Sequence, residues 1–142
     1  MSQENRALVH RWFEEVWNKG RTEAIDEMFH SEGLAHGLAD HPDKHLKGPE
    51  GFKPFFQAFR SAFPDINIVV EQTIAEGDLV SARCLVRGTH TGDGLGLAAT
   101  KQPVYFTGMT IVRIKDGKII EGWNNFDMLS MFQQLGAVHL PS

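Results

Sequence analysis

Apolar residues in the first half of the chain recur at helical spacing. In the first segment they fall in pairs every four residues, which defines one broad helical face that ends at Gly20. A second, short helix is expected to begin with Thr22 as its N-cap. A third is expected over Gly48–Phe63, where five phenylalanines repeat at helical spacing before a proline stops them. Pro54 fits this helix only if it falls in the first turn.

The second half alternates apolar and polar residues with period two, as half-buried strands do. Asp116-Gly117 is a strong signal for a two-residue hairpin turn. The expected strands are residues 34–38, 66–76, 79–90, 104–114 and 118–126, and a last helix follows at 128–135. Helices grouped before consecutive antiparallel strands predict an α+β fold. In that fold a curved, cone-shaped antiparallel sheet wraps over the N-terminal helices in one domain, residues 1–142.

The alternation also predicts which side chains point into the cone. In the strand 79–90 every second residue from Val80 is apolar until His90, so His90 is expected to face inward. If Asp116-Gly117 closes a two-residue hairpin, the inward face carries Val104, Phe106, Ile119, Glu121, Trp123, Asn125 and Asp127. Burying either acid without a partner would cost several kcal/mol, so we expect an apolar pocket with some polar groups inside the cone.

The opposite face of the same two strands is apolar for a surface. On this assignment it carries Met109, Ile111, Arg113, Ile120 and Phe126. A large exposed apolar patch is typical of a protein interface. We therefore expect a homodimer or homotetramer that associates through the outer face of the sheet.

Composition and charge exclude several classes of protein. The formal net charge is -4, which is too acidic for the phosphate contacts of a nucleic-acid-binding protein. The single cysteine, Cys84, leaves no intrachain disulfide, and we expect it to be buried and inert. The start of the sequence lacks the regions of a signal peptide, and no apolar run approaches the ~18 residues of a membrane span. We expect a cytoplasmic protein without nucleic-acid or membrane partners.

Several short motifs resemble those of the SnoaL-like polyketide cyclases, in the same order along almost the whole chain. They are Gly48-Pro49-Glu50-Gly51, Phe63-Pro64-Asp65, Gly88-Thr89-His90-Thr91-Gly92, Asp116-Gly117-Lys118-Ile119 and the stretch from Asp127 to Gln134-Leu135-Gly136. These cyclases belong to the nuclear-transport-factor-two-like superfamily of cone-shaped α+β folds. The resemblance therefore implies the same fold, whereas this fold hosts isomerases, hydrolases, cyclases and binding modules.

The resemblance also implies a chemistry. Family cyclases close a ring by intramolecular aldol condensation without a metal or organic cofactor, with an aspartate as acid and base. Asp127 stands where that residue is expected, and His36 and His90 are the candidates to hold a carbonyl oxygen as charge develops. Aromatic walls suit a small hydrophobic, even polycyclic aromatic, ligand. The predicted ligand-contacting residues are Trp12, Phe13, Phe56, Phe59, Glu121, Trp123 and Asn125.

Each of these assignments has a structural alternative. Asp127 precedes a predicted helix and Asp is a good N-cap, so it could serve only as a cap. His90 could be a hydrogen-bonded histidine at a strand end, and most of the aromatic residues could be core. His36, His41 and His45 fit no familiar ligand spacing, so no metal site is predicted. The functional alternatives are a non-catalytic small-molecule-binding module and an isomerase or hydrolase on the same fold.

Overall fold

The computed structural model describes residues 2–39 and 43–141. Its helical elements are α1 (Ser2–Arg11), the π-helical segment η1 (Trp12–Asn18) that continues it, α2 (Thr22–Met28), α3 (Gly48–Ala62) and α4 (Met128–Gln134). Its strands are β1 (Phe29–His36), β2 (His45–Lys47), β3 (Asn67–Glu76), β4 (Leu79–Thr89), β5 (Pro103–Lys115) and β6 (Lys118–Phe126). The predicted α+β fold is confirmed. No described helix has both the length and the apolar character needed to cross a membrane.

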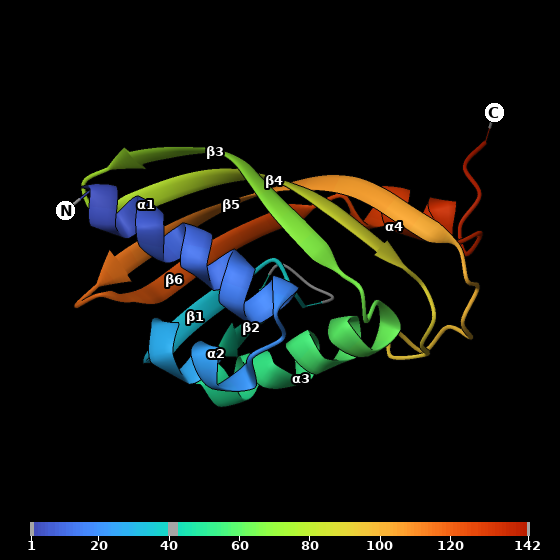
Figure 1. Ribbon diagram of the computed structural model, residues 1–142, viewed down its shortest axis with the longest axis horizontal. Coiled ribbons are helices and arrows are strands. Elements are labelled where there is room, and N and C mark those ends of the chain that lie inside the picture. The colour runs from blue at the N-terminus through green and yellow to red at the C-terminus, as the bar shows by residue number, and fades with distance from the viewer. Residues whose placement is uncertain (1, 40–42, 142) are drawn as a thin grey trace.

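The strands form one curved sheet in the order β2-β1-β6-β5-β4-β3. All neighbouring strands are antiparallel except β1 and β6, which run parallel. Helices α1, α2 and α3 lie against one face of this sheet, and α4 lies beyond the end of β6 (Figure 1). The inner face of β5 is built by its alternate buried residues, and Val104 and Phe106 point inward as predicted.

Three local expectations were wrong. The first strand starts at Phe29, directly after α2, rather than at Leu34. Thr22 is the first residue of α2, and Arg21 is its N-cap without a side-chain hydrogen bond. Pro54 lies inside α3 rather than in its first turn. Proline has no backbone N–H, so α3 lacks one backbone hydrogen bond at this position.

Two side-chain amides act as strand partners. β3 is an edge strand, and Asn18 of η1 binds both backbone groups of Ile68 in it: Asn18 Nδ2 donates to Ile68 O over 2.9 Å, and Ile68 N donates to Asn18 Oδ1 over 2.6 Å. Gln134 of α4 binds Tyr105 N and O in the same manner, both at 2.8 Å. Tyr105 lies past the last β5–β6 pair, so Gln134 replaces the missing strand there.

Candidate functional site

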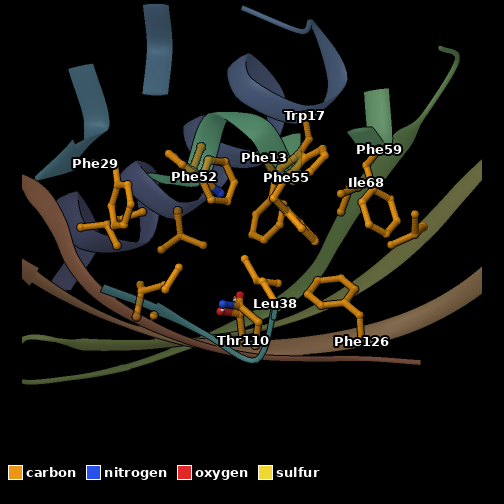
Figure 2. Close-up of a pocket in the computed structure, with 18 of the residues that line it drawn as sticks. Phe13, Trp17, Phe29, Leu38, Phe52, Phe55, Phe59, Ile68, Thr110 and Phe126 are labelled. Atoms are coloured by element: carbon orange, nitrogen blue, oxygen red, sulfur yellow. Dashed lines mark hydrogen bonds between the residues drawn. The ribbon is translucent and has the colours of Figure 1, made fainter. Parts of the chain in front are cut away.

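A cavity of about 80 Å³ lies between the inner face of the sheet and the helices η1 and α3 (Figure 2). Its wall is mainly aromatic and includes Trp12, Phe13, Trp17, Phe29, Phe52, Phe55, Phe59, Phe106 and Phe126. Three of the predicted ligand-contacting residues, Trp12, Phe13 and Phe59, are in this wall. Phe56 does not line the cavity, because it is buried in the core with its ring 5.4 Å from that of Trp17.

The size of this cavity restricts what can enter it. An engineered apolar cavity of about 150 Å³ binds benzene, and this cavity has only about half of that volume. Leu38, Phe55 and Met128 line the cavity and are only half-buried. A ring-bearing ligand therefore enters only if side chains such as these move.

Thr110 of β5 and Asn124 of β6 form a polar pair in this apolar wall. Thr110 Oγ1 donates to Asn124 Oδ1 over 2.9 Å, and Asn124 Nδ2 donates to the backbone oxygen of His36 over 2.9 Å. Both side chains line the cavity, and Figure 2 shows Thr110 on the sheet side, opposite the phenylalanines of α3. Apart from the indoles of Trp12 and Trp17, the described lining residues offer no other polar side chain.

A β-bulge overturns the predicted inward face of β6. Ile114 pairs with Ile119 as expected, but Arg113 pairs with Glu121, which leaves Ile120 as an extra residue. Because side chains alternate along a strand, one extra residue exchanges the two faces beyond it. The cavity is therefore lined by Gly122, Asn124 and Phe126.

The prediction that Glu121, Trp123, Asn125 and Asp127 point into the cone is accordingly wrong. Trp123 pairs with Ile111 and Asn125 with Met109, and those two β5 residues are 45% and 51% exposed on the outer face. Phe126, expected on the outer face, points into the cavity instead.

Asp127 is the N-cap of α4. Its Oδ1 accepts a hydrogen bond from Ser130 N over 3.0 Å, and its own backbone N donates to Thr107 O over 2.9 Å. The residue is exposed and does not line the cavity, whereas its neighbours Phe126 and Met128 both do. Asp127 therefore lies next to two residues of the cavity wall while it caps the helix.

His36 lies on the outer face of the sheet, so the expectation that it points inward is wrong. It is paired with Trp123 of β6, and the two rings stack at 5.6 Å between centroids. Its Nε2 lies 2.7 Å from Oε2 of Glu121, and its ring is 5.6 Å from that of His45. No group of three metal-ligating side chains occurs among the residues described, and His41 falls outside them.

His90 points inward as predicted, but it does not line the cavity. It is fully buried, and its ring lies 5.5 Å from Phe63, which belongs to the core. Its Nδ1 accepts a hydrogen bond from Thr100 N over 3.1 Å, so in the neutral ring the proton is on Nε2. Nε2 has no partner among the described residues. This geometry is that of a buried histidine that holds the segment between β4 and β5.

Comparisons with known proteins agree with this fold. The family described as SnoaL-like polyketide cyclase matches residues 7–135 of the chain. The chain belongs to this family. Aklanonic acid methyl ester cyclase DnrD of Streptomyces peucetius is 32% identical over 130 residues, covering 91% of this chain and 88% of that protein. Nogalonic acid methyl ester cyclase of Streptomyces nogalater is 29% identical over 122 residues, covering 85% and 90%.

A solved structure shows that the likeness includes the three-dimensional fold. Wild-type IdmH of Streptomyces antibioticus superposes with a TM-score of 0.80 at 30% identity, covering 93% of this chain and 98% of that chain. The SnoaL-like family membership supports a cyclase-type function, and the superposition on IdmH shows that the fold is shared.

Sequence reasoning missed the polar pair of the cavity. Thr110 could have been found, because it shares the period-two face of Val104 and Phe106 on β5. Asn124 could not, because its orientation depends on the bulge at Ile120.

Proposed function

We propose that the protein is a cofactor-independent, cyclase-type enzyme that closes a ring in a small, mainly apolar carbonyl compound. The observation that carries this proposal is an aromatic cavity whose described wall includes the Thr110–Asn124 polar pair. Such a site binds an apolar skeleton and orients it by one polar group. The names of the relatives, methyl ester cyclases for aklanonic and nogalonic acid, support the same class of reaction.

Intramolecular aldol ring closure needs only proton transfers. A base removes a proton from the carbon next to one carbonyl, the resulting enol or enolate carbon attacks a second carbonyl carbon, and the attacked oxygen takes up a proton. Our proposal assigns the proton transfer to Asp127. The support for this assignment is its place between Phe126 and Met128, two residues of the cavity wall. A ligand that extends out of the cavity would meet this carboxylate at the rim.

Two substitutions of Asp127 test the assignment. Asp127→Asn keeps an oxygen that can accept from Ser130 N, so the fold and ligand binding should persist. Turnover of a cyclisable keto ester should fall by about 10²–10⁴-fold, because an amide cannot take up the proton. Asp127→Ala removes the cap and should in addition cost about 0.5–2 kcal/mol of stability. Melting temperature and single-turnover rate are measured for both variants, and an active Asp127→Asn protein ends the assignment.

A second candidate function is a binding module without catalysis. The observation that favours it is that no ionisable side chain lines the cavity among the described residues. In that case Asp127 is only a cap, and Asp127→Asn would be silent in stability and in ligand affinity. A rate of ring closure with the protein that equals the rate without it, at saturating ligand, would establish this alternative.

A further inference from the structure

The orientation of the Asn124 amide is fixed by its two neighbours. The backbone oxygen of His36 can only accept a hydrogen bond, so the group 2.9 Å from it must be Nδ2. Oδ1 then faces Thr110 Oγ1, whose hydroxyl must donate to it over 2.9 Å. The hydroxyl hydrogen of Thr110 is therefore bound to Asn124 and cannot be donated to a ligand.

The backbone around this pair leaves little room for it to rearrange. Gly37, next to His36, has a φ of +83°, and a Cβ added there would lie 2.0 Å from Asn124 O. A side chain at position 37 is therefore excluded both by conformation and by contact. This close approach of β1 to β6 keeps the oxygen of His36 beside the Asn124 amide.

The pair has a defined set of hydrogen-bonding groups left for a ligand. Thr110 Oγ1 retains its lone pairs, Asn124 Oδ1 retains one, and Asn124 Nδ2 retains one hydrogen. The pair is thus richer in acceptors than in donors, and it is uncharged. Thr110 is 2% exposed, so a lone pair on its hydroxyl oxygen that receives no hydrogen bond from the ligand would not be reached by water instead.

We propose that Thr110 and Asn124 select a hydroxyl group, so that the ligand is held as a neutral enol or phenol rather than as a ketone or an enolate. A hydroxyl can donate to Thr110 Oγ1 and accept from Asn124 Nδ2, whereas a ketone oxygen can only accept. An anionic oxygen would face lone pairs in an apolar wall. This inference rests on the proposed function, because it places the ligand in the same cavity.

This selection has a chemical consequence for ring closure. The carbon next to an enol carbon is the nucleophilic atom of an aldol reaction. When it attacks a second carbonyl, the enol becomes a ketone and releases its hydroxyl proton, while the attacked oxygen gains one, so the overall reaction is an isomerisation. Holding the enol therefore enriches the reactive tautomer before the bond forms.

Three monocyclic probes test the selection: phenol, which donates and accepts; anisole, which only accepts; and toluene, which does neither. Binding to the full chain is followed by NMR titration of its backbone amides. Phenol should bind about tenfold more tightly than anisole or toluene, the usual order for one or two additional hydrogen bonds. Thr110→Val should remove that preference, whereas Thr110→Ser, which keeps the hydroxyl, should retain it.

The outcomes separate the two proposals. Equal binding of the three probes to wild type, or an unchanged phenol preference in Thr110→Val, overturns the inference and leaves the cavity as a binding site. If no probe shifts the amides of cavity-lining residues, the proposed function fails and the inference fails with it.

A spectroscopic measurement reports the protonation state of a bound hydroxyl directly. The neutral and anionic forms of 4-nitrophenol absorb at different wavelengths, so its ionisation can be followed in the bound state. We expect the pKa of the bound probe to rise, because the acceptors and the apolar wall favour the neutral hydroxyl. A lowered pKa would show that the cavity prefers the anion and would overturn the inference.

Discussion

The Asn18 clamp on the edge strand should contribute measurably to stability. Asn18→Ala removes two hydrogen bonds to Ile68, of 2.9 and 2.6 Å, and Ile68 is only 6% exposed. At about 0.5–1.5 kcal/mol for each bond, the free energy of unfolding should fall by about 2 kcal/mol. A chain of 142 residues has an unfolding entropy of roughly 0.3 kcal/mol/K, so the melting temperature should fall by about 7 °C.

An isosteric variant makes the clamp pH-dependent. In the wild type, Asn18 Nδ2 donates to Glu14 over 3.1 Å as well as to Ile68 O. Asn18→Asp still accepts from Ile68 N, but its ionised carboxylate places a second oxygen against Ile68 O and near Glu14. Both neighbours raise the pKa of the new carboxyl above its unfolded value of about 3.9. The protonated form can donate to Ile68 O. Stability is therefore present at low pH and is lost as the pH rises through the raised pKa.

Thermal unfolding of wild type, Asn18→Ala and Asn18→Asp at pH 4 and pH 7 measures both effects. Asn125→Ala is the matched control, because Asn125 is exposed on the outer face and should change stability by less than about 0.5 kcal/mol. The reasoning is refuted if Asn18→Ala melts with the Asn125→Ala control. It is also refuted if the deficit of Asn18→Asp relative to wild type is the same at both pH values.

Other predictions concern single side chains. Burial raises the pKa of the Cys84 thiol to about 12. Iodoacetamide at pH 8 should therefore label the native protein at least about 10³-fold more slowly than the unfolded protein. Labelling is followed by mass spectrometry, and equally fast labelling of the native protein would contradict the prediction. Burial opposes ionisation of Asp65, but hydrogen bonds from Thr89 N and Oγ1 outweigh it and lower its pKa, so its contribution to stability is present above pH 4 and is lost as the pH falls through the lowered pKa. The stability advantage of wild type over Asp65→Asn in urea titrations should therefore shrink toward pH 3. If the 45% exposed Ile111 lies in a homodimer contact, Ile111→Glu should convert the dimer to a monomer in light scattering, and a monomeric wild type would remove the prediction.

The order and type of the elements followed from the sequence because their periodicities are strong. The phenylalanines of α3 and the alternation in β4 and β5 each specify one buried face over many residues. The sequence predicts the start of β1 five residues too late, because the first part of the strand includes His30, Ser31 and Glu32, which obscure the apolar pattern. The fold was thus predictable where one face is continuously buried, and less so at the sheet's irregular edge.

The site was less predictable than the fold, because one residue decides it. Ile119 and Ile120 are both apolar, so the local pattern is compatible with either face pointing inward. The pairing of β6 with β5 places a bulge at Ile120, and this bulge decides which residues of β6 line the cavity. The hydrogen bond of His90 to Thr100 likewise depends on a chain reversal that periodicity does not describe.

The bulge also separates charge from the cavity, and this separation constrains the substrate. With Glu121 and His36 on the outer face, the described residues of the cavity wall include the uncharged Thr110–Asn124 pair and no ionisable side chain. Asp127, to which our proposal assigns proton transfer, follows β6 as the N-cap of α4. Asp127 is three positions beyond Asn124, which is about 10 Å along an extended chain. A substrate that reaches both the polar pair and Asp127 must therefore be longer than a single ring. Because the cavity of about 80 Å³ cannot hold such a molecule as it stands, binding must be accompanied by movement of half-buried side chains of the wall, such as Phe55 and Met128.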